Sequence, residues 1–166
     1  PVIQAADLPD GAFENDPALK KCRVFETAFG LDVHPENNTI YIQCAGEMYE
    51  PASYTGGIIS VNPATYETAL LLDDGDDENH PYGNISGMAV ISPTKGYFSG
   101  YAGWGDTSLF AFNPSTGAVS GTVSDYLKNK NIAGMESGAY TDKNGMLWVC
   151  NASDAEIVVL NTADDS

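Results

Sequence analysis

A short phrase occurs three times in this chain and constrains its fold more than any other feature. Segments 58–65, 109–117 and 157–163 each lead from an apolar run into an asparagine, and the third copy is the weakest. These asparagines, Asn62, Asn113 and Asn161, are 51 and then 48 residues apart. Apolar, β-branched runs that stop at Asn, Pro and Gly are typical of strands ending in turns. A period of about 50 residues predicts a repeat array, and propeller blades have that period.

The elements around the phrase recur in the same order. Strands are predicted at 40–44, 57–62, 96–100, 108–113, 146–150 and 156–161, and helix should be minor. A fourth strand is predicted at 66–72 and 118–123 in the first two copies, whereas the third copy lacks one. The chain is therefore expected to be all-β, with blades of four antiparallel strands at about 30–72, 85–123 and 137–163.

The repeats also resemble a known family. Segments 38–42, 94–98 and 143–149, each followed by a strand that ends in Asn-Pro or Asn-Thr, are similar to YVTN-type β-propeller repeats of surface-layer-like, extracytoplasmic proteins. The resemblance implies a β-propeller fold and a location outside the cytoplasm, in the periplasm, on the cell surface or secreted. It does not specify an activity, because propellers host unrelated chemistries. No catalytic motif stands out in the sequence, so we expect a non-catalytic module that binds a protein, a small molecule or a carbohydrate on its loop-rich face, or that builds a surface assembly.

Three blades are too few for a closed ring, since propellers have roughly 4 to 8 blades. An open ring leaves sheet edges that are normally paired or covered. The sequence therefore predicts a partial ring that is completed by further chain or by another copy. Residues 1–29 form an N-terminal segment that could supply a closing strand, with 22–27 as the best candidate.

The charge of the chain restricts its partners. Its formal net charge is −16, from 23 acidic and 7 basic residues. This surface repels nucleic acids and anionic membranes and favours cations or basic partners. No apolar run reaches the roughly 20 residues of a membrane span.

The cysteines and the glycosylation sequons leave alternatives open. The chain has an odd number of cysteines, Cys22, Cys44 and Cys150. If a disulfide forms, a Cys22–Cys44 pair is favoured over a Cys44–Cys150 pair. Buried free thiols are the alternative. Sequons at Asn37, Asn84 and Asn151 permit glycosylation without showing it.

Binding residues are expected on the long loops, which should all open on one face of the propeller, opposite the short turns. Long loops on a rigid scaffold are where binding usually resides. The alternative is that their aromatic residues only pack the loops onto the sheets. The candidate ligand or partner contacts are Tyr49, Tyr54, Tyr82, Tyr101, Trp104, Tyr126 and Glu136.

The densest run of carboxylates in the chain is a candidate metal site. Closely spaced oxygen ligands suit Ca²⁺, although this run does not match the EF-hand loop, and a solvated acidic loop is the alternative. The lone His34 and His80 do not support zinc. The candidate Ca²⁺ ligands are Asp73, Asp74, Asp76, Asp77 and Glu78.

An enzymatic alternative comes from segment 142–151, which also resembles a blade of gluconolactonase-type, divalent-metal propellers. In a lactonase-like hydrolase of that kind, Glu136, Asn151 and Asp32 would be the metal ligands near the central axis. No spacing in the sequence forces these three together.

The core is predicted from equivalent places in the repeats. Tyr41, Tyr97 and Trp148 occupy the same position in the second strand and should pack between blades with their polar tips hydrogen-bonded. Val61, Phe112 and Leu160, which precede the three asparagines, should be buried as well.

Overall fold

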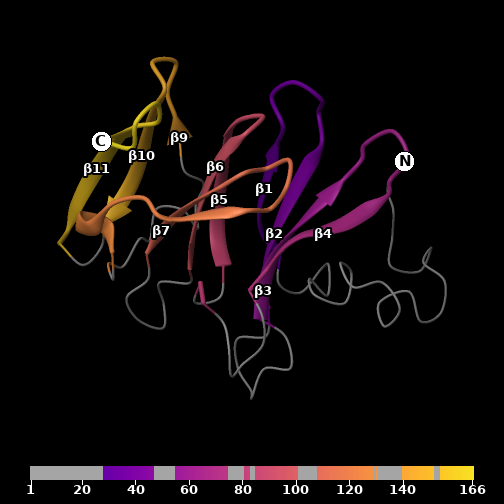
Figure 1. Cartoon of the computed structure of the whole chain (residues 1–166), viewed down its shortest axis with the longest axis horizontal. Coiled ribbons are helices and arrows are strands. Elements are labelled where there is room, and N and C mark those ends of the chain that lie inside the picture. The colour runs from indigo at the N-terminus through magenta and orange to yellow at the C-terminus, as the bar shows by residue number, and fades with distance from the viewer. Residues whose placement is uncertain are drawn as a thin grey trace.

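The computed structural model describes residues 28–46, 55–74, 81–82, 85–100, 108–128, 130, 140–151 and 154–166. These residues form three antiparallel sheets and one short 3₁₀ helix (Figure 1). The strands are β1 (Ala28–Val33), β2 (Ile40–Gly46), β3 (Thr55–Val61), β4 (Thr68–Asp73), β5 (Ile85–Ser92), β6 (Lys95–Gly100), β7 (Leu109–Phe112), β8 (Val119–Thr122), β9 (Tyr140–Thr141), β10 (Met146–Asn151) and β11 (Glu156–Asn161), and the 3₁₀ helix η3 is Asp125–Leu127.

Each sheet is an up-and-down meander. The first sheet has the order β1-β2-β3-β4, the second β5-β6-β7-β8, and the third β11-β10-β9. The predicted all-β class, the six predicted strands and the two predicted fourth strands are therefore confirmed. The described residues form no closed barrel or propeller ring, and the third sheet has three strands among them.

The recurring asparagine builds the same turn in all three sheets. Its side-chain oxygen accepts a hydrogen bond from the amide two residues later, at Ala64, Ser115 and Ala163, over 2.8–3.1 Å. Its backbone amide donates to the carbonyl of the fifth residue on, which is Glu67, Ala118 and Ser166. The third phrase is weaker as a sequence but identical as a turn, because the asparagine supplies the local bonds.

The turns also share one strained backbone position. Tyr66, Gly117 and Asp165 lie four residues after the asparagine and have φ values of 61°, 75° and 61°. Only glycine adopts this left-handed conformation without cost. At Gly117 glycine has a second reason, because a Cβ atom there would overlap the carbonyl oxygen of Leu71 in the first sheet.

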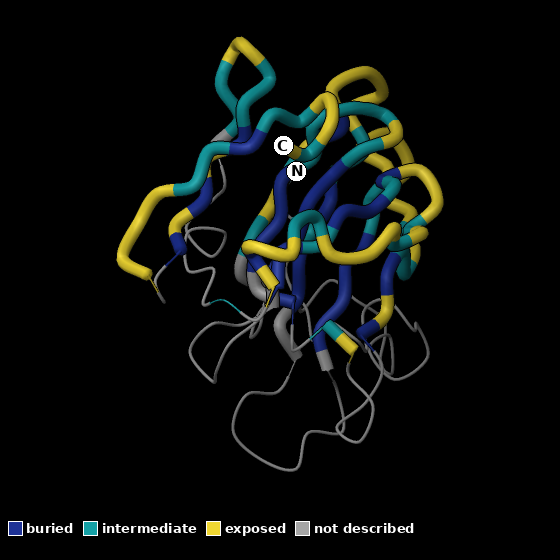
Figure 2. The backbone as a smooth tube through the Cα atoms, turned by 60° about the vertical axis from the view of Figure 1, so that its left-hand side comes forward, coloured by how far each residue is buried: buried dark blue, intermediate teal, exposed yellow. Residues whose placement is uncertain are grey.

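The three sheets stack face to face, and the core lies between them (Figure 2). Tyr41, Ile58 and Leu72 of the first sheet pack against Ile85, Met88, Phe98 and Phe112 of the second. Ala89, Tyr97, Leu109 and Ala111 of the second sheet pack with Leu127 against Leu147, Val149 and Leu160 of the third. The apolar faces of the sheets are buried against each other, and this burial stabilises the stack.

Polar contacts fix how consecutive sheets align. The carboxylate of Asp32 in β1 accepts a 2.6 Å hydrogen bond from the amide of Val90 in β5. The Tyr41 hydroxyl donates to the carbonyl of Pro114, and the Tyr97 hydroxyl donates to the carboxylate of Asp165. In both cases the second-strand tyrosine reaches the asparagine turn of the next sheet, so core packing and turn position are coupled.

The predicted core residues divide into buried and exposed ones. Tyr41, Tyr97, Phe112 and Leu160 are buried as predicted. The prediction is wrong for Trp148, whose side chain is 43% exposed, and Val61 is only half-buried. Trp148 has the same register position as the two tyrosines, but no described residues of a following sheet cover it.

The cysteines differ in state. Cys44 is buried and disulfide-bonded, whereas Cys150 is a free, exposed thiol, so these two are not paired with each other. The remaining cysteine, Cys22, belongs to residues 1–27, which lie outside the described residues together with the predicted closing strand. Asn37 is exposed in a turn, Asn84 is outside the described residues, and the Asn151 side chain is buried.

We expect opposite faces of β10 to differ in their contribution to stability. Leu147→Ala should lower the free energy of unfolding by about 2–5 kcal/mol, because Leu147 fills the interface with the second sheet. Trp148→Ala should lower it by less, because Trp148 is partly in solvent. Urea denaturation followed by circular dichroism measures both. An equal or larger loss for Trp148→Ala would contradict the structure.

We also predict the disulfide partner of Cys44. The sequence holds three cysteines and Cys150 is free, so peptide mapping without reduction should find Cys44 linked to Cys22. The unreduced folded protein should contain one thiol that reacts with a maleimide, at Cys150. A Cys44–Cys44 link between two copies would disprove this pairing.

Candidate functional site

The two ends of each sheet are built differently. The tight turns at 34–39, 62–67, 93–94, 113–118, 142–145 and 161–166 all lie at one end. The connections that leave the opposite end are longer in all cases but one: β2 to β3, β4 to β5, β6 to β7 and β8 to β9 are each separated by eight or more residues, whereas β10 and β11 are separated by four. We call these the turn end and the loop end. This arrangement agrees with the predicted asymmetry, and Figure 2 shows the exposed tight turns gathered on one side.

The structure describes a minority of the residues predicted for ligand binding. Tyr82 and Tyr126 are described, whereas Tyr49, Tyr54, Tyr101, Trp104 and Glu136 lie outside the described residues. The two described tyrosines have different surroundings, which separates the binding interpretation from the packing interpretation.

Tyr82 is a packing residue. Its ring meets Phe98 and Phe110 edge to face, with ring centroids 5.3 and 5.2 Å apart. Its backbone amide donates a 2.8 Å hydrogen bond to the carboxylate of Asp74, which is fully buried. Tyr82 and Asp74 therefore hold the segment that precedes β5 against the first and second sheets.

Tyr126 is the centre of a polar cluster at the loop end. The residue is half exposed, and its hydroxyl donates a 2.6 Å hydrogen bond to the carboxylate of Glu156 at the start of β11. The Lys130 ammonium lies 5.7 Å from the centre of the Tyr126 ring and forms a 2.6 Å ion pair with Asp154. Asp154 also accepts a hydrogen bond from the Asn151 amide at 2.9 Å. These contacts join η3 to the β10–β11 connection.

The contacts within this cluster shift the pKa values of two of its members, Tyr126 and Asp154. The hydrogen bond to Glu156, with smaller effects from burial and from the charges of Glu156 and Asp154, raises the pKa of Tyr126 to about 12. Hydrogen bonds from Lys130 and Asn151 lower the pKa of Asp154. Near neutral pH the Tyr126 phenol is therefore neutral and the Asp154 carboxyl group is ionised.

The acidic run is described only at its start. Asp73 is exposed at the end of β4, and Asp74 accepts the Tyr82 amide, while Asp76, Asp77 and Glu78 lie outside the described residues. Within the described ranges, no group of three or more His, Cys, Asp and Glu side chains could hold a metal ion. His34 accepts the amides of Glu36 and Asn37 at its Nδ1 atom and thus shapes its own turn.

The residues of the hydrolase alternative are not gathered by the described structure. Asp32 lies next to the β1–β2 turn and accepts the amides of Val33 and Val90. Asn151 lies at the opposite, loop end of its sheet and donates to Asp154. Glu136 lies outside the described residues. Asp32 and Asn151 thus have separate structural roles at opposite ends of the stack.

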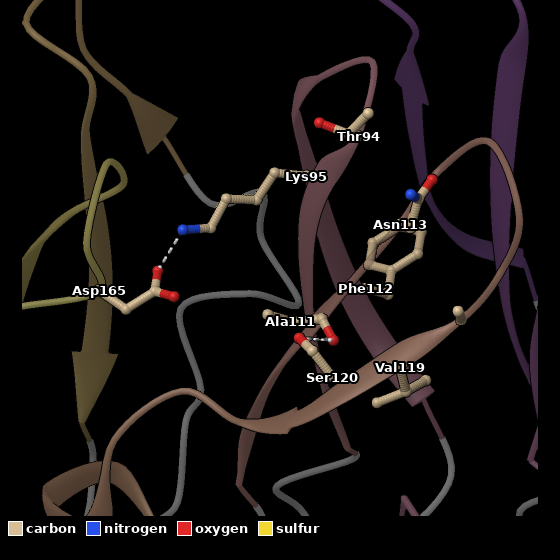
Figure 3. Close-up of a pocket in the computed structure, with 9 residues that line it drawn as sticks. Thr94, Lys95, Ala111, Phe112, Asn113, Val119, Ser120 and Asp165 are labelled. Atoms are coloured by element: carbon tan, nitrogen blue, oxygen red, sulfur yellow. Dashed lines mark hydrogen bonds and ion pairs between the residues drawn. The ribbon is translucent and has the colours of Figure 1, made fainter.

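A cleft that the sequence did not suggest lies at the turn end. It has a volume of about 540 Å³ and opens between β7, β8 and the final turn (Figure 3). Lys95 and Asp165 bridge it with a 2.8 Å ion pair, and the Lys95 ammonium also donates to the carbonyl of Thr162 at 2.7 Å. These contacts connect the second and third sheets, so the charged groups of the cleft already bind each other.

No protein-family model matches this chain, and comparisons with curated proteins and with solved structures found no match. Among the described residues, no helix is long and apolar enough to cross a membrane.

We expect Glu156 to control the titration of Tyr126. In Glu156→Gln the pKa of Tyr126 should fall from about 12 toward the ordinary tyrosine value of about 10, because an amide does not oppose formation of the phenolate. Nuclear magnetic resonance of the labelled tyrosine rings measures this pKa. Asp125→Asn removes the same charge nearby and is the control. A pKa that stays near 12 in Glu156→Gln would contradict the hydrogen bond.

Proposed function

We propose that this chain is a non-catalytic, extracytoplasmic module of β-propeller repeats that binds a basic protein or peptide through its loop end. The sheets would be blades of a partial ring, as the resemblance to YVTN-type repeats implies. The observation that carries the proposal is the difference between the two ends of the stack. Tight turns lie at the turn end, whereas the long connections leave from the loop end, where the polar cluster around Tyr126 is exposed.

The blade interpretation is supported by the way one sheet repeats the next. Asn62, Asn113 and Asn161 form the same turn, and the interfaces on either side of the second sheet use the same register positions. A location outside the cytoplasm is supported by the disulfide at Cys44, because disulfides persist in oxidising compartments.

The kind of partner is inferred from charge. Asp73, Asp125, Asp154 and Glu156 lie at or near the loop end, and the whole chain carries a formal net charge of −16. A surface of this sign attracts cationic segments and speeds their association at low salt. The half-exposed Tyr126 ring adds a face on which a lysine or arginine of the partner could rest.

A lysine-rich peptide, titrated into the isotopically labelled protein at low salt, tests the proposal. The amide signals of Tyr126 and Glu156 should shift, whereas those of the turn-end residues Glu67 and Asn113 should not. Asp125→Asn should weaken binding by about two- to fivefold, the effect of losing one exposed charge pair.

Glu67→Gln is the matched control, because it removes the same charge from an exposed side chain at the turn end. Equal weakening by the two variants, or shifts spread evenly over both ends, would mean that the peptide senses only net charge. That result would disprove a binding site at the loop end.

A further inference from the structure

The first and second sheets each have one face that points toward the following sheet. We call this face, and the equivalent face of the third sheet, the forward face. On the first sheet this face carries Tyr41, Gln43 and Ile58, and on the second it carries Tyr97, Ser99 and Leu109. Strand register places Trp148, Cys150 and Ile157 at the same positions of the third sheet, since Trp148 pairs with Val159 as Tyr97 pairs with Ala111.

The same positions differ sharply in exposure. All three residues on the forward faces of the first and second sheets are buried, with at most 2% of their surface exposed. On the third sheet Trp148 is 43% exposed, Ile157 is 65% exposed, and Cys150 is exposed. Because neighbouring side chains of a strand alternate between faces, Leu147 and Val149 of the same strand are buried against the second sheet.

The polar tips of the aromatic residues show the same difference. Tyr41 and Tyr97 donate their hydroxyl hydrogens to the asparagine turn of the sheet in front of them. The indole Nε1 of Trp148 instead donates over 3.3 Å to Asp142 in the turn of its own sheet, at the surface.

We propose that the forward face of the third sheet is a docking surface for a further antiparallel sheet of this same repeat type. That sheet would bring apolar residues like Leu147, Val149 and Leu160 to cover Trp148 and Ile157. Its asparagine turn would offer an oxygen to the Trp148 indole. The inference rests on the proposed blade architecture but does not depend on binding at the loop end.

A second copy of the chain is a less suitable occupant. Its first sheet would have to present the face opposite Tyr41, on which Leu31 and Val33 are exposed. On that face Cys44 and Ile59 are already buried, so its loop-end half is covered. That face therefore exposes Leu31 and Val33 near the turn end and does not match the exposed positions of Trp148, Cys150 and Ile157.

The chain itself provides a way to add a sheet in register. Ser166 and Glu67 occupy the same turn position, so residues 68–128 can be joined directly after Ser166. This extension supplies a fourth strand for the third sheet and then a complete copy of the second sheet, and it contains no cysteine. Cys150 remains the free thiol and reports whether the forward face is covered.

The measurement is the rate at which a maleimide alkylates Cys150. In the extended protein the rate should fall by at least about tenfold relative to the parent chain, because a covered thiol reacts only when the contact opens. Phe98→Asp in the added copy should restore the parent rate, because Phe98 lies on the face that would meet Trp148. Unchanged reactivity in a well-folded extension would overturn the proposal.

A second extension keeps the test decisive if the first one does not fold. Ala118 also shares the turn position of Ser166, so residues 119–166 can be joined after Ser166, with Cys150→Ser in the added copy. The proposal requires protection of the original Cys150 by a folded extension, and failure of both extensions to protect it would overturn the proposal. In the parent chain the alkylation rate should not depend on protein concentration. A rate that falls with concentration, together with a dimer in sedimentation velocity, would assign the face to a second copy.

These results are separable from the binding proposal. The lysine-peptide titration reports on Tyr126 and Glu156 at the loop end, which the added sheet does not need to cover. Protection of Cys150 without peptide binding would leave the docking surface standing alone, and peptide binding without protection would leave the loop-end site standing alone.

Discussion

The contact that the rest of this structure depends on is the burial of one sheet face against the next through a tyrosine of the second strand. Tyr97 lies fully buried between the second and third sheets, and its hydroxyl is bonded to Asp165, which also pairs with Lys95. Burial and the hydrogen bond to Asp165 both raise the pKa of Tyr97, so the phenol stays neutral. Because this contact buries the apolar faces of two neighbouring sheets, it stabilises both sheets and sets their relative position at the same time.

The rigid stack that results determines where function can reside. The turn end is occupied by asparagine turns, which are held by their own hydrogen bonds and by hydrogen bonds from tyrosines of neighbouring sheets. At the loop end, Asp74 and Tyr82 hold the chain against the core, and the cluster around Tyr126 remains accessible. The exposed forward face of the third sheet is a second, apolar surface. The two surfaces differ in chemistry, so a charged ligand and a further sheet could occupy them together.

Several of these features could be predicted from the sequence because their causes are local. The strands follow from alternating β-branched and aromatic runs, and the turns follow from asparagines that bond their own backbone. Tyr41 and Tyr97 were correctly placed in the core because equivalent repeats bury equivalent positions. The separation of tight turns from long connections also followed from spacing alone.

The sequence by itself therefore determined the secondary structure, the repeat register and the asparagine turns, since each depends on residues close together in the chain. Only the tertiary structure decided which equivalent residues differ in environment. Trp148 matches Tyr97 in register but is exposed, because burial depends on a neighbouring sheet. The sequence left ligand contact and loop packing open for Tyr82, and the fold shows that its ring packs on Phe98 and Phe110. Tyr126 owes its raised pKa to Glu156, a residue 30 positions away that only folding brings near.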